Sequence, residues 1–126
     1  MGFVDAVKSA YGNYANFKGR ASRSEYWWFQ LFFMVVYFGV MILAGVLSAF
    51  MGEAILSIMS IVIMVFALGS ILPSIALAAR RMHDSDKSGW FMLVPIYSLY
   101  LAIIKGTDGP NRFGPDPVGP NVDTFN

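Results

Sequence analysis

The sequence contains no cysteine and only one histidine among its 126 residues. The lack of cysteine excludes disulfide bonds, thiolate metal sites and cysteine nucleophiles, and it leaves the redox compartment open. Charge is also scarce, because charged residues make up 13% of the chain, whereas a soluble domain carries roughly 25%. The net charge of +1 gives no strong field that would attract nucleic acid. Much of the surface is therefore expected to face something other than water.

Long apolar runs take the place of the missing charge. Hydrophobic residues make up 56% of the chain, and the mean hydropathy is +0.57. Between Tyr26 and Ala79 the only charged residue is Glu53. A transmembrane helix needs about 20 apolar residues, so this stretch holds two spans, residues 26–50 and 54–79. Glu53 is then expected in the turn between them, and the alternative is an intramembrane carboxylate on a proton path.

A third apolar run covers residues 90–104 and allows two interpretations. At 1.5 Å per residue its length is about 22 Å, which is short of the ~30 Å hydrocarbon core. We expect a short third span that extends to Ser88, with Lys105 snorkelling to the membrane surface. The alternative is a re-entrant segment that returns to the side from which it entered. Pro95 predicts a bend in either case.

The residues before the first span show a helical period. At 100° per residue, residues 3–17 have one apolar and one polar face, which predicts an N-terminal amphipathic helix. Such a helix either lies in the membrane interface or packs on the protein's own loops. Ser22 and Glu25 then match the Ser-x-x-Glu capping box at the start of the next helix. Residues 1–25 are thus expected to form an interfacial and cytoplasmic segment.

The most polar stretch, residues 80–89, is predicted to be a short loop at the cytoplasmic edge of the membrane. One histidine and two aspartates are too few ligands for a typical metal site, so we expect no metal and no other cofactor. We expect instead paired charges that also touch lipid phosphates. The candidate polar cluster comprises Glu25, Arg80, Arg81, His83, Asp84, Asp86, Arg112 and Asp116.

The tail, residues 105–126, is rich in proline and glycine and is therefore predicted to be irregular, with disorder after Pro120. If this tail is cytoplasmic, like the polar loop, we expect Arg112 and Asp116 to pack against that loop with Arg81 and Asp84.

Basic residues predict the orientation, because they are retained on the cytoplasmic side of a membrane. They occur before the first span and in the polar loop, but none lies beside Glu53. The N-terminus is therefore expected in the cytoplasm. A spanning third run would leave seven basic residues inside and two outside, whereas a re-entrant one would leave all nine inside.

Small residues recur at helical spacing within both predicted spans. They let helices approach closely in a bilayer, where burial alone does not drive association. The chain is therefore expected to contact membrane lipids and to assemble with itself or with another membrane protein. The candidate helix-packing residues are Ala44, Gly45, Ser48, Ala49, Ser70 and Ser74.

Three motifs together resemble one bacterial family, the domain of unknown function 805. Residues 17–28, Phe-Lys-Gly-Arg-Ala-Ser-Arg-Ser-Glu-Tyr-Trp-Trp, resemble its N-terminal motif. Residues 81–84 with 88–90 resemble its central motif, and residues 106–109 with 111–117 resemble its tail motif. The resemblance implies a small multi-pass protein of the bacterial cytoplasmic (inner) membrane. It implies no activity and supplies no catalytic or binding residues.

Three functions fit these features, all in a single all-α integral membrane domain over residues 1–126. The favoured one is a non-catalytic membrane module that assembles with itself or a partner. The second is a small transporter or channel subunit, although neither long span has an unambiguous buried charge. The third is an enzyme acting on lipid headgroups, with His83 as base and Asp84 orienting it. No nucleophile–base pair is visible in the sequence, which favours a non-enzymatic role.

Overall fold

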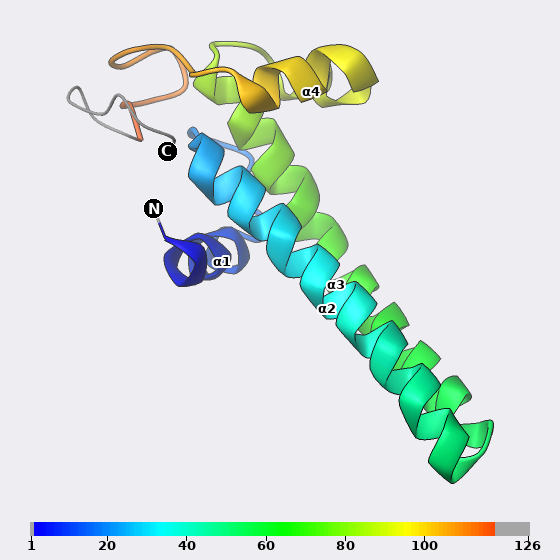
Figure 1. The fold of residues 1–126 in the computed structure, drawn as a ribbon. Coiled ribbons are helices and arrows are strands. Elements are labelled where there is room, and N and C mark those ends of the chain that lie inside the picture. Colours follow the sequence, from blue (N-terminus) through cyan, green and yellow to red (C-terminus); the bar gives the residue numbers. More distant parts are fainter. Residues whose placement is uncertain (1, 118–126) are drawn as a thin grey trace.

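The computed structural model describes residues 2–117, which form helices joined by short irregular segments. The two longest helices make an antiparallel hairpin, a short helix crosses one flank of it, and another crosses its upper end (Figure 1). The predicted all-α class is confirmed for the described residues. In chain order the elements are α1 (Phe3–Gly12), α2 (Arg23–Met51), α3 (Ala54–Asp84), the 3-10 helix η1 (Gly89–Leu93) and α4 (Pro95–Ile103).

The helices α2 and α3 are long and apolar enough to cross a membrane. They contain 29 and 31 residues, with apolar windows of mean hydropathy 2.4 and 2.7. Most of their large apolar side chains are exposed, as expected of a surface that faces lipid. Gly52, at a φ of 85°, and Glu53 separate the two helices. The turn in the structure therefore lies at the position where the sequence predicted that the apolar run divides.

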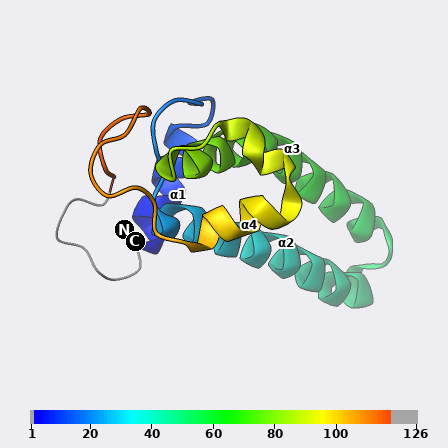
Figure 2. The same cartoon turned by 90° about the horizontal axis from the view of Figure 1, so that it is seen from above.

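The third apolar run does not form a third spanning helix, which corrects the first of our two interpretations. It is divided between η1 and α4, and the nine residues of α4 reach only about 14 Å. Val94 is extended between them (φ −98°, ψ 101°), because Pro95 disfavours a helical conformation in the residue before it. Figure 2 shows α4 lying over the end of the hairpin, between α2 and α3. Among the described residues, two helices have spanning length.

The polar stretch at residues 80–89 is not entirely a loop, which is a second correction. The helix α3 continues to Asp84, so only residues 85–88 connect it to η1. Basic side chains stabilise the negative end of a helix dipole, and Arg80 and Arg81 lie in this last part of α3. Both also form buried ion pairs here, Arg81 with Asp84 of the same helix and Arg80 with Glu25 of α2.

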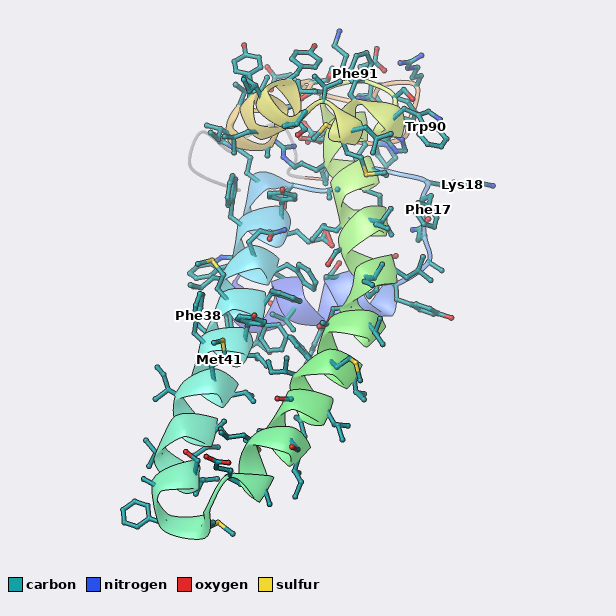
Figure 3. The ribbon with its side chains drawn as sticks, turned by 90° about the vertical axis from the view of Figure 1, so that its right-hand side faces the viewer. Phe17, Lys18, Phe38, Met41, Trp90 and Phe91 are labelled. Atoms are coloured by element: carbon teal, nitrogen blue, oxygen red, sulfur yellow. The ribbon has the colours of Figure 1, made fainter. Side chains whose placement is uncertain are left out.

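The helix α1 packs on the hairpin itself rather than on loops. Ala10 is buried, and the Tyr11 ring contacts Phe29 and Phe32 at centroid distances of 5.6 and 6.0 Å. The Tyr11 hydroxyl forms a 2.7 Å hydrogen bond with Ser70 Oγ. Figure 3 shows α1 lying across the hairpin, below its upper end. This is the orientation that an interfacial helix would have beside two spans.

The described part of the tail, residues 105–117, is irregular, as its proline and glycine content predicts. Its one element of pairing is an isolated bridge, in which Asn111 and Gly114 exchange two backbone hydrogen bonds of 3.0 Å. The predicted disorder after Pro120 concerns residues outside the described part of the chain.

Candidate functional site

One carboxylate lies between two arginines at the upper end of the hairpin. Arg20 Nε is 3.0 Å from Asp84 Oδ1, and Arg81 Nη1 is 2.6 Å from Asp84 Oδ2. None of the three side chains is more than 4% exposed. Charges are stable in such a place only when they are paired and fully hydrogen-bonded. These three residues form what we name the clasp.

Arg20 connects the clasp to the tail. Its Nη1 donates to the Gly109 carbonyl at 2.6 Å, and its Nη2 donates to the Thr107 carbonyl at 2.5 Å. A longer bond of 3.3 Å reaches the Gly114 carbonyl. Arg20 precedes α2 and its acceptors follow α4, so one guanidinium joins segments that are 87 to 94 residues apart in the sequence.

Arg81 connects the clasp to two other segments. Its Nη1 donates to the Ala21 carbonyl at 3.2 Å, and its Nε donates to the Ala102 carbonyl at 3.4 Å. Its Nη2 donates to the carbonyl of Ile104, just after α4. Every guanidinium nitrogen of Arg20 and Arg81 therefore has an acceptor within the chain.

The tail passes unusually close to Asp84. The Thr107 amide donates to the Asp84 carbonyl at 2.7 Å. A Cβ atom at Gly106 would lie 1.9 Å from Asp84 Oδ2 and 2.5 Å from its carbonyl oxygen. Only glycine fits at this position, so this glycine of the tail motif is needed for the tail to pass next to Asp84.

A second buried ion pair lies beside the clasp. Arg80 Nη1 is 3.1 and 3.3 Å from the two carboxylate oxygens of Glu25, and Ser9 Oγ donates to one of them at 2.6 Å. The Glu25 amide donates to Ser22 Oγ at 3.2 Å, which is the predicted N-cap of α2. Arg80 Nε and Nη2 are buried and make no hydrogen bond within residues 2–117. Because unmade hydrogen bonds are costly, this pair contributes less to stability than the clasp does.

His83 lies past the apolar part of α3 and faces a different set of groups. Its Nδ1 is 2.9 Å from the Gly19 carbonyl oxygen. A carbonyl can only accept, so Nδ1 carries the proton. The ring stacks on Phe113 at 3.9 Å between centroids, with 2° between the planes. Burial lowers the pKa of His83, the hydrogen bond to the Gly19 carbonyl opposes this shift, and the charges of Arg112 and Arg80 add to it. The net lowering favours the neutral ring at pH 7.

The structure gathers the predicted polar cluster at one end of the molecule, but in separate groups. Arg112 Nε pairs with Asp86 Oδ1 at 3.2 Å on the surface, rather than with the clasp. Asp116 accepts a hydrogen bond of 3.0 Å from a backbone amide of the tail itself. The tail therefore packs against the end of α3, where the ion pair of Arg112 is with Asp86 and not with Asp84. Among the described residues, no three histidine, aspartate or glutamate side chains gather as metal ligands would.

Sequence reasoning missed Arg20, which is absent from the predicted cluster. Its acceptors are mainly backbone carbonyls of the tail. Because every residue has a backbone carbonyl, the sequence does not indicate which ones bind Arg20. The available signal was its place in the N-terminal motif, directly after Gly19, which has a φ of 86°. Gly106 was missed for a related reason, because its role depends on the path of the chain past Asp84.

The predicted helix-packing residues fall into different environments. Ala44 of α2 is buried, and Ser70 of α3 is hydrogen-bonded to Tyr11 of α1. Gly45 and Ala49 lie on an exposed face of α2, and a Cβ at Gly45 would meet nothing within 4 Å. The remaining two, Ser48 and Ser74, are partly exposed.

Comparisons with known proteins place the three motifs in one family. The profile of the family described as "Protein of unknown function (DUF805)" matches residues 14–115. Inner membrane protein YhaI of Escherichia coli (strain K12) is 38% identical over 112 residues, which cover 83% of this chain and 88% of the relative. Inner membrane protein YhaH of the same strain is 36% identical over 112 residues, with 83% and 89% covered. No solved structure matches. The chain belongs to the DUF805 family.

Proposed function

We propose that this protein is a non-catalytic module of the bacterial inner membrane that assembles through its helical hairpin. The observation that carries the non-catalytic part of this proposal is that the polar side-chain atoms of the clasp are all occupied by hydrogen bonds within the chain. All guanidinium nitrogens of Arg20 and Arg81, and both carboxylate oxygens of Asp84, bind atoms of the chain itself. A catalytic group has to be within reach of a substrate. The three motifs therefore shape and hold the fold.

The distribution of charge supports an orientation with the clasp in the cytoplasm. All nine lysines and arginines lie in α1, near the ends of α2 and α3 opposite the turn, or after α3. Glu53 is the only charged residue at the turn. Because basic residues are retained on the cytoplasmic side, both the N-terminal helix and the described tail belong there.

The length of the hairpin beyond α1 supports a double crossing. The helix α1 meets the hairpin at Phe32 and Ser70. At 1.5 Å per residue, the path from Phe32 to Met51 is about 29 Å, and that from Ala54 to Ser70 is about 24 Å. The hydrocarbon core is about 30 Å thick, so α1 would lie at one interface and the turn at the other.

Assembly between copies would use the exposed face of α2 around Gly45 and Ala49. Since a side chain at Gly45 would meet nothing in the single chain, this face is open to a neighbouring helix. Small residues let two backbones approach in lipid, and dispersion contacts then hold them together.

The test is energy transfer between labelled copies in liposomes. The chain has no cysteine, so Asp108→Cys at an exposed site accepts donor and acceptor dyes. We expect Gly45→Leu to abolish the energy transfer without unfolding the hairpin. Gly39→Leu is the matched control, because Gly39 is also exposed and unobstructed but lies about 120° away around α2. Absence of transfer in the parent protein, or equal transfer in both leucine variants, would contradict the proposal.

A further inference from the structure

A pocket of about 400 Å³ opens beside the clasp, between α3, η1 and the segment that follows α1. Figure 3 shows two of its lining residues, Phe17 and Trp90, on the same side of the molecule, with Trp90 above Phe17. Ile75, Ala79 and Met92 complete the apolar part of the wall. A concave, mostly apolar site with few polar groups is the usual form of a small-molecule site.

His83 supplies a hydrogen-bond acceptor to this pocket. Its Nδ1 is engaged by the Gly19 carbonyl, so the lone pair is on Nε2. A Cβ built at Gly89, another lining residue, would lie 3.4 Å from Nε2, which places this atom at the pocket wall. The histidine is 7% exposed, and Nε2 makes no hydrogen bond to the described part of the chain. An acceptor without a hydrogen-bond partner at the wall of a pocket favours a ligand that brings a donor.

An apolar path leads from the spanning part of α3 to this acceptor. Leu68, Leu72, Ile75, Ala79 and His83 are spaced three or four residues apart and therefore share one face of the helix. The first three are at least 39% exposed. A molecule dissolved in the bilayer can follow this face upward, with its apolar body along α3 and its polar end at His83.

We propose that the pocket binds a membrane-dissolved molecule with an apolar body and a hydroxyl group, which donates a hydrogen bond to His83 Nε2. Two sources offer this chemistry, a lipid alcohol such as a diacylglycerol and a ring alcohol such as a phenol or quinol. Ser88 also lines the pocket, and its Oγ accepts from the Trp90 amide at 3.4 Å, so its own proton is available to the ligand oxygen. The site goes beyond the assembly function, since it needs neither a second copy nor a partner protein.

The single histidine makes a site-specific test possible. Labelling histidine with 15N gives one imidazole in the full-length protein, which would be placed in phosphatidylcholine nanodiscs. The ring-alcohol probe is 4-octylphenol, with 4-octylanisole as its match without a donor. The lipid-alcohol probe is dioctanoylglycerol, with trioctanoylglycerol as its match. We expect a hydroxyl probe to move the Nε2 signal upfield and to leave the Nδ1 signal in place.

The variant Gly89→Ala places a methyl group 3.0 Å from Ala79 Cβ and 3.4 Å from Nε2, both at the pocket wall, and should abolish the probe-dependent shift. An unchanged Nδ1 signal in this variant shows that the bond to Gly19 survives. Gly12→Ala is the control, because a Cβ there meets nothing within 4 Å. A shift with one hydroxyl probe supports the proposal and identifies the source, and a shift with both supports the shared chemistry. No shift with either, equal shifts with the donor-free matches, or a full shift in Gly89→Ala would overturn it.

Discussion

The Asp84 carboxylate is shared by two buried arginines, and the clasp depends on it. Asp84→Asn would leave Arg20 and Arg81 buried without a counter-charge. Breaking a buried pair in this way costs about 3–5 kcal/mol. We expect the free energy of unfolding to fall by that amount, as measured by denaturant titration in detergent micelles.

The matched control for this prediction is Asp108→Asn. The Asp108 side chain is 82% exposed and, within residues 2–117, forms its ion pair with Lys105 on the surface. Surface ion pairs contribute little because water screens them, so this variant should unfold like the parent protein. An Asp84→Asn variant that is equally stable would show that the clasp does not hold the fold.

Gly106 is the second residue on which the clasp depends, for a steric reason. Gly106→Ala would bring a methyl group within 1.9 Å of the Asp84 carboxylate, so the tail has to move away. Overpacking of this kind costs about 1–3 kcal/mol. We expect trypsin to cleave after Arg112 faster in this variant, because a tail released from the clasp can enter the active site of the protease. Gly12→Ala, which adds a methyl group to open space, should be cleaved at the parent rate.

Among the elements, α1 is held to the hairpin by two side-chain hydrogen bonds, from Ser9 to Glu25 and between Tyr11 and Ser70, besides its aromatic contacts. Tyr11→Phe removes the 2.7 Å bond to Ser70 and leaves the ring packing in place. A net loss of about 1 kcal/mol is expected for one such bond. Faster hydrogen–deuterium exchange of the α1 amides would reveal this loss. Tyr14→Phe, at a side chain that is 57% exposed, should leave the exchange unchanged.

The elements also show what the sequence could and could not predict. The apolar run with Gly52 and Glu53 predicted two long helices and their turn, because length and charge alone decide that division. The length of the apolar run did not predict the structure of residues 90–104. There the effect of Pro95 on the backbone of Val94 separates η1 from α4. The groups that hold Arg20 were beyond prediction, since backbone carbonyls of a distant segment carry no residue signature.

The whole molecule joins an apolar hairpin to a polar end that holds both the N-terminal motif and the tail. Its basic residues are distant from the turn at Glu53, and α4 lies across the hairpin rather than continuing away from it (Figures 1 and 2). If the hairpin crosses the membrane, the clasp therefore lies entirely on one side. We propose that this side is the cytoplasm.

The most direct measurement is labelling of single cysteines in spheroplasts with a membrane-impermeant maleimide. Two exposed sites serve, Glu53→Cys at the turn and Asp108→Cys in the tail. We predict that Glu53→Cys is labelled in intact spheroplasts and that Asp108→Cys is labelled only after lysis. Labelling of Asp108→Cys before lysis would place the tail outside and would contradict a cytoplasmic clasp.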